Sequence, residues 1–92
     1  SADEAKRISL INDCVPDDQL TKSVMDLAKK ISEKSQAVLK IGKEAFYKQL
    51  DLNIEDAYEY TSMVMTKNMM IDDASEGINS FLDKRNPKWR NK

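Results

Sequence analysis

The chain has 92 residues, 34% of them charged and 40% hydrophobic, with a formal net charge of −1 at pH 7. This composition excludes an intrinsically disordered chain and predicts one soluble domain, or part of one, with a modest core. The small net charge provides no global field for nucleic acid or an anionic membrane, and no apolar run approaches the ~18 residues of a spanning helix. We therefore expect neither nucleic acid nor a membrane as a partner.

Residue types that catalytic sites commonly use are missing. Histidine is absent, and the only glycines are Gly42 and Gly77. The chain thus lacks the usual general base near neutral pH, the commonest metal ligand and any Gly-rich phosphate loop. Cys14 is the single cysteine, which excludes an internal disulfide, and its apolar surroundings favour an inert side chain over a nucleophile. We expect no catalytic residue and no metal site in this chain.

The first 15 residues predict a short capped helix over residues 1–7 and a strand over Leu10–Val15, which is rich in apolar and β-branched residues. No other segment has a strand pattern, so this strand needs a sheet edge elsewhere. We assign residues 1–15 to the remnant of a preceding core and residues 16–92 to a helical segment. The predicted fold class is all-α, with four helices in residues 16–92 and one short orphan strand.

The four helices are predicted over residues 18–33, 36–50, 54–70 and 72–85. We expect the first to begin at an aspartate cap, the second at Ser35 and the third at Asn53. The first helix carries one apolar stripe with helical spacing, formed by Leu20, Val24, Leu27, Ala28 and Ile31.

The second and third helices have apolar residues on more than one face, which predicts burial on two sides. Gly42, in the middle of the second helix, indicates a close helix–helix crossing. Four of the five methionines lie between Met63 and Met70. They fit either adaptable core packing or a pliable docking surface for another subunit.

Acidic pairs stand at three predicted helix starts, where capping explains them better than catalysis or metal binding; they are Asp17/Asp18, Glu55/Asp56 and Asp72/Asp73. In the last helix, Ile78, Phe81 and Leu82 have the spacing of one apolar face. This helix either packs on a bundle or carries Phe81 and Lys84 to a ligand.

A basic segment with one tryptophan ends the chain; its cations are Lys84, Arg85, Lys88, Arg90 and Lys92. It is either a frayed tail or a surface for nucleic acid, a membrane or a phosphorylated ligand. Phosphate recognition requires only one well-placed cation, such as Lys84 or Arg85.

These runs together resemble the C-terminal third of the crotonase, or enoyl-CoA hydratase/isomerase, superfamily. The resemblance covers essentially all 92 residues and is carried by the run Glu76-Gly77-Ile78-Asn79-Ser80-Phe81-Leu82-Asp83-Lys84-Arg85-Asn86-Pro87-Lys88-Trp89. The run Ile41–Leu50 is similar to a mitochondrial subgroup of that family, although no transit peptide is visible here. Ser9 departs from the family pattern, which usually has glycine at this position.

The resemblance implies the C-terminal helical region of a ClpP-like spiral fold, whose catalytic carboxylates and oxyanion hole lie outside this segment. It implies that this segment covers the active site and helps to form a trimer, which is commonly paired into a hexamer. The whole protein would be a mitochondrial lyase or isomerase of fatty acid metabolism. Acyl-CoA would be its ligand, without a further cofactor. Phe81 would pack near the adenine, and Lys84 near the 3′-phosphate, of coenzyme A bound to a neighbouring subunit. The alternative is a stand-alone helical interaction module without enzymatic activity.

Overall fold

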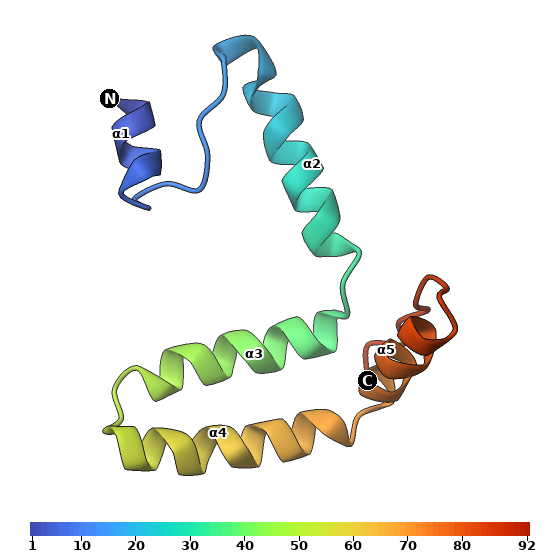
Figure 1. The fold of residues 1–92 in the computed structure, drawn as a ribbon. Helices are drawn as coiled ribbons and strands as arrows, with labels where there is room; N and C mark the ends of the chain where they lie inside the picture. The colour runs from blue at the N-terminus through green and yellow to red at the C-terminus, as the bar shows by residue number, and fades with distance from the viewer. The chain divides into compact units, whose positions relative to one another are not determined.

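The computed structural model describes residues 1–92 and contains helices and no strand (Figure 1). Its elements in chain order are α1 (Ala2–Arg7), the 3₁₀ turn η1 (Asp17–Gln19), α2 (Leu20–Ser32), α3 (Gln36–Gln49), α4 (Ile54–Met69) and α5 (Asp72–Leu82). They form two compact units, Ser1–Ile31 and Ser32–Lys92, and each is described by itself. The all-α prediction is confirmed. The assignment of residues 1–15 to a preceding core stays a prediction.

The predicted strand over Leu10–Val15 is wrong. The backbone bends at residues 10–12 and then runs without regular structure to Pro16. The Cys14 amide donates to the neighbouring Asp13 carboxylate at 2.8 Å instead of joining a ladder. A strand exists only with a partner to share its backbone hydrogen bonds, and no other segment of this chain supplies one.

The turn after α1 contains Ser9, at the position where the family pattern usually has glycine. Ser9 has a φ of 60°, in the left-handed region that glycine adopts without steric cost. The Leu10 amide donates to the Ala5 carbonyl at 2.9 Å and the Ser9 amide to the Lys6 carbonyl at 3.0 Å, which is the bond pair of a Schellman motif. The chain therefore keeps the glycine-type turn with a serine in it.

Helix α2 begins through η1 and not at an aspartate cap as predicted. Pro16 stands at the cap position of η1, and no side chain bonds to the free amides there. The proline fixes an extended backbone before the turn, and the turn itself starts the helix. The predicted apolar stripe is present on α2, but its side chains are about half exposed. Within the first unit, Leu20, Val24 and Leu27 face a hollow of about 760 Å³ that Ile11 and Val15 also line.

Helices α3 and α4 form an antiparallel hairpin, in which they run side by side (Figure 1). Both predicted caps are confirmed. Ser35 Oγ accepts from the Val38 amide at 3.2 Å, and Asn53 Oδ1 accepts from the Asp56 amide at 2.9 Å. Near the turn that joins the two helices, Lys48 Nζ lies 4.6 Å from the centre of the Tyr60 ring, a cation–π contact between α3 and α4.

The hairpin is open along its length. A groove of about 230 Å³ runs between the two helices, and an added Cβ at Gly42 would meet no atom within 4 Å. The close crossing predicted at Gly42 is therefore absent within this chain. The groove is lined by residues spaced along one face of each helix: Val38, Ile41, Gly42, Ala45, Thr61, Val64, Met65 and Asn68.

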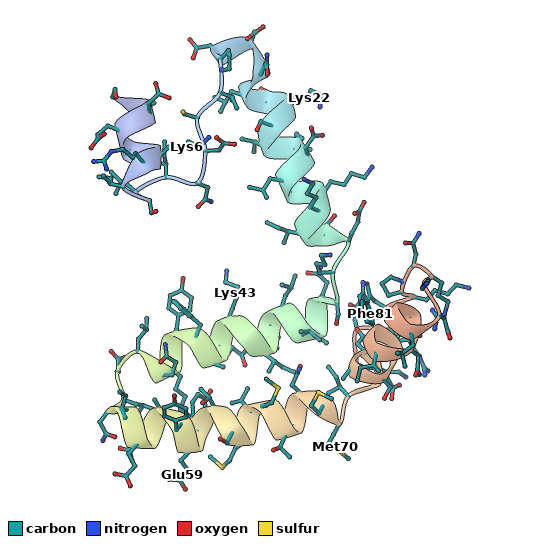
Figure 2. The ribbon with its side chains drawn as sticks, viewed as in Figure 1. Lys6, Lys22, Lys43, Glu59, Met70 and Phe81 are labelled. Carbon is teal, nitrogen blue, oxygen red and sulfur yellow. The ribbon has the colours of Figure 1, made fainter.

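No hydrophobic side chain of the chain is buried, and the only buried residues are Ser35, Asp73 and Ser80. The four clustered methionines are exposed, with Met70 at 82% of its full surface. Figure 2 shows Lys43 and Glu59 on the outer sides of the hairpin, facing away from it. The methionines are therefore not buried within this chain, and the docking surface for another subunit stays a prediction. No helix is long and apolar enough to cross a bilayer.

Candidate functional site: the end of α5 and the C-terminal segment

The two predicted ligand-binding residues lie together at the end of α5. Phe81 is in the last turn of the helix with 82% of its surface exposed (Figure 2). Lys84 follows the helix by two residues, is exposed, and its side chain makes no hydrogen bond or ion pair. The helix thus presents one free aromatic face and one free cation at the same end.

A Schellman motif fixes the backbone at Lys84. The Arg85 amide donates to the Ser80 carbonyl at 3.0 Å, and the Lys84 amide donates to the Phe81 carbonyl at 3.2 Å. Lys84 has a φ of 51°, at the position where helices usually place glycine. A lysine in the left-handed region costs about 1 kcal/mol, and such strain is typical of functional positions.

Next to Lys84, Arg85 is held by an ion pair. Its Nη1 and Nη2 donate to the two oxygens of Glu76 at 2.6 and 3.0 Å, and its Nε donates to Asp83 at 3.3 Å. Glu76 also accepts from the Lys88 amide at 2.7 Å. The Arg85 guanidinium and the Lys88 amide lower the pKa of Glu76 to about 2, so this carboxylate is charged at neutral pH. The segment after α5 is therefore bonded back to the body of the helix.

The first turn of α5 contains a buried carboxylate that the sequence did not reveal. Asp73 is 1% exposed and accepts three hydrogen bonds, from Ser35 Oγ at 2.5 Å and from the amides of Arg90 and Asn91 at 2.7 and 3.0 Å. Its own amide donates to the Lys92 carbonyl at 3.0 Å. We call α5 together with residues 83–92 and their contacts to residues 33–36 the C-terminal clasp.

Burial raises the pKa of Asp73, but the hydrogen bonds from Ser35 and from the Arg90 and Asn91 amides outweigh it and place the pKa below its ordinary value. A buried carboxylate with this many donors stays ionised. The expectation that Asp72 and Asp73 cap α5 is wrong, because Ile71 occupies the cap position and no side chain bonds there. Asp73 instead binds the amides of a segment 17 and 18 residues further along.

The frayed tail, which the sequence left as one alternative, is not observed. The Trp89 indole donates to the Glu33 carbonyl at 2.7 Å, and its ring would meet a Cβ at Gly77 at 3.5 Å. The Gln36 amide, one of the free amides at the start of α3, donates to Asn91 Oδ1 at 2.9 Å. The sequence signal for this arrangement is weak: one aromatic and one asparagine in a basic segment.

The other candidate residues do not assemble into a reactive site. No group of three or more Cys, Asp or Glu side chains could hold a metal ion. The Cys14 thiol donates to Asp3 at 3.2 Å, and this bond raises its pKa, which disfavours the nucleophilic thiolate. The Asp56 carboxylate accepts a hydrogen bond from Asn53 Nδ2 at 2.7 Å, and Asn53 in turn caps the Asp56 amide at the start of α4.

A second hollow of about 440 Å³ lies between α3 and α5. Most of its wall is apolar, but four polar residues also line it, and one of them, Asn68, has a buried Oδ1 without a hydrogen-bond partner. It is lined by Lys34, Ser35, Val38, Leu39, Asn68, Met69, Asp73, Ala74, Gly77, Ile78 and Trp89.

Comparison with known proteins identifies the family of this chain. A family model described as enoyl-CoA hydratase/isomerase matches residues 1–92. The chain belongs to the enoyl-CoA hydratase/isomerase family. Mouse enoyl-CoA hydratase domain-containing protein 3, mitochondrial, is 45% identical over 89 residues, which cover 97% of this chain and 30% of that protein. A probable mitochondrial enoyl-CoA hydratase of Dictyostelium discoideum is 29% identical over 92 residues and 33% of its length.

Solved structures of this family contain the same helical arrangement. An enoyl-CoA hydratase of Mycobacterium smegmatis superposes with a TM-score of 0.88 at 39% identity, over 97% of this chain and 35% of that one. Human enoyl-CoA hydratase domain-containing protein 3 superposes with a TM-score of 0.78 at 43% identity, over 82% of this chain and 30% of that one. The family resemblance is therefore confirmed, and the match is consistent with the predicted C-terminal helical region. The chain spans about a third of the length of these enoyl-CoA hydratase relatives. The ligand roles of Phe81 and Lys84 stay predictions.

Proposed function

We propose that this chain serves an enoyl-CoA hydratase/isomerase-family protein as a helical region that completes a coenzyme A pocket, covers the active site and supports oligomerisation. The observation that carries the proposal is the exposed ring of Phe81 beside the unpaired ammonium of Lys84 at the end of α5. An aromatic face suits stacking on an adenine, and a free cation suits a phosphate monoester. Acyl-CoA is accordingly the proposed ligand, with no further cofactor.

The exposed apolar surface supports the oligomeric role. No hydrophobic side chain is buried, and the stripe of α2 and the methionines of α4 are about half exposed or more within their own units. Surfaces of this kind mark protein–protein contacts. A trimer, or a pair of trimers, would cover them and would bring α5 to the coenzyme A of a neighbouring subunit. The same observation does not favour the alternative of a stand-alone helical module, which should bury its own core.

The chemistry itself is proposed to come from outside residues 1–92. The chain has no histidine, and its Glu76 and Asp73 carboxylates serve an ion pair and the clasp. The whole protein would then be a lyase or isomerase of acyl-CoA in fatty acid metabolism, and the chain alone would be inactive. Since the mouse and Dictyostelium relatives are named mitochondrial, we place the protein in the mitochondrion. Hydration of crotonyl-CoA by the isolated chain would contradict this division of roles.

The ligand proposal is tested by Lys84→Ala in the whole protein that contains these residues. Loss of a charged hydrogen bond should weaken coenzyme A binding by about 1–3 kcal/mol and leave 3′-dephospho-coenzyme A binding unchanged. Isothermal titration with both compounds measures the two affinities. Lys43→Ala is the matched control, because this lysine is exposed on α3, away from α5 (Figure 2). Unchanged coenzyme A affinity in an intact oligomer would remove Lys84 from the site.

A further inference from the structure

Two neighbouring cations at the end of α5 differ in how they are used. Arg85 takes both nearby carboxylates, Glu76 through a bidentate bond and Asp83 through its Nε. Lys84, directly between Asp83 and Arg85 in the chain, is left without a side-chain partner. A planar guanidinium suits a fixed two-point pair, whereas a lysine ammonium is a point charge that can meet a single phosphate.

Glu76 joins the segment around Lys84 to the helix. This carboxylate is in the second turn of α5, its side chain is 20% exposed, and it receives Arg85 from nine residues further along and the Lys88 amide from twelve. These two bonds fix the chain on the C-terminal side of Lys84, while the Schellman motif fixes its N-terminal side. The strained φ of 51° at Lys84 is thus held from both directions.

We propose that the Glu76–Arg85 pair is a positioning device that determines phosphate specificity at Lys84, an inference that rests on the proposed coenzyme A role of Lys84. The pair holds the left-handed turn in place. It also occupies the two carboxylates that would otherwise compete with an anionic ligand for the Lys84 ammonium. Arg85 acts through Glu76 and does not contact the ligand.

The decisive variant is Glu76→Gln in the whole protein, with coenzyme A and 3′-dephospho-coenzyme A as the two probes. If Glu76 positions Lys84, the preference for the phosphorylated compound falls about three- to tenfold, the scale of one charge-assisted hydrogen bond, while dephospho-coenzyme A binds as before. If Arg85 itself binds the phosphate, releasing it from Glu76 raises the preference instead. An unchanged or increased preference therefore overturns the inference.

Two further variants separate positioning from charge and from folding. Glu59→Gln removes one negative charge from the exposed side of α4 and should leave the preference unchanged (Figure 2). Arg85→Lys keeps the charge and loses the bidentate geometry, and should lower the preference as Glu76→Gln does. Equal loss of both ligands in Glu76→Gln would show a general fold defect and overturn the inference. A wild-type protein without any preference for the 3′-phosphate would refute the proposed role of Lys84, and the inference with it.

Discussion

The C-terminal clasp and the α3–α4 hairpin belong to the same compact unit but are stabilised in opposite ways. The clasp is built from directed polar bonds around two carboxylates, Asp73 and Glu76, and Asp73 is the most deeply buried residue of the chain, at 1% exposure. The hairpin has apolar faces and an open groove, and none of its hydrophobic side chains is buried. From this difference we infer that the chain carries its own determinants for the shape of the clasp, and we predict that the hairpin packs on another surface.

This contrast fits the proposed function. A residue that must meet a phosphate needs a fixed backbone, and the clasp provides it at Lys84. A surface that must pack on another subunit needs exposed apolar side chains, and the hairpin provides Met63, Met65 and Met69.

The largest effect is expected from Asp73→Ala. This change removes the acceptor of the buried Ser35 hydroxyl and of the partly buried amides of Arg90 and Asn91. We expect the thermal midpoint to fall by about 5 °C or more and the Trp89 fluorescence to shift toward that of a solvated indole. Asp72→Ala is the matched control, since Asp72 is exposed and bonds only the exposed Arg90 guanidinium. Equal shifts in the two variants would contradict the central place of Asp73.

The second largest effect is expected in the stability of the protein at low pH. The folded state lowers the pKa of Glu76 from its ordinary 4.5 to about 2, so the unfolded chain takes up this proton first as the pH falls. The stability contributed by the Glu76–Arg85 pair should be complete above about pH 4.5 and should disappear as the pH approaches about 2. Thermal unfolding of the wild type and of Glu76→Gln, compared from pH 7 to pH 2, measures it. A difference between the two proteins that stays constant down to pH 2 would exclude this linkage.

Lys84→Gly should separate stability from binding. Glycine relieves the left-handed backbone and stabilises the end of α5 by about 1 kcal/mol, yet it removes the proposed phosphate ligand. The thermal midpoint should rise while coenzyme A affinity falls. Ser9→Gly tests the same turn in the other unit, where φ is 60°, and should raise the midpoint without affecting binding. A higher affinity of Lys84→Gly for coenzyme A would contradict the proposed phosphate contact of Lys84.

The smallest effects compare the two helical glycines. Alanine at either position improves helix propensity by about 1 kcal/mol. At Gly77 the new Cβ would make an ordinary contact with the Trp89 ring, at 3.5 Å, so stability should rise under all conditions. At Gly42 the space is empty in this chain, so the isolated chain should gain stability while a docked partner helix would be displaced. Sedimentation of Gly42→Ala in the whole protein shows whether the oligomer weakens; an unaffected oligomer would place no subunit contact at Gly42.

The sequence predicted the parts of this structure that depend on local chemistry. Ser35 and Asn53 were identified as caps because a cap bonds to an amide three residues away. Asp73 was misassigned for the same reason: its position next to a helix start resembles a cap, but its partners lie 17 and 18 residues away. The prediction of a strand over Leu10–Val15 failed because the sequence pattern describes only side chains. A strand also needs a neighbouring strand for its backbone hydrogen bonds, and this chain has none.

For the candidate site, the family resemblance supplied Phe81 and Lys84, and the structure added the residues that hold them. No periodicity could indicate that Arg85 would bind Glu76 and leave Lys84 free, because that choice depends on the turn after Leu82. The apolar stripe of α2 was correctly predicted, yet its exposure was not, since a pattern does not show whether a partner is present.

Amide hydrogen exchange on the isolated 92-residue chain tests most directly whether the clasp is held by its own bonds while the hairpin requires another surface. The account predicts slow exchange at the amides of Lys88, Arg90 and Asn91, which donate to Glu76 and Asp73, and faster exchange in the middle of α3 and α4. Protected hairpin amides together with freely exchanging clasp amides would contradict it.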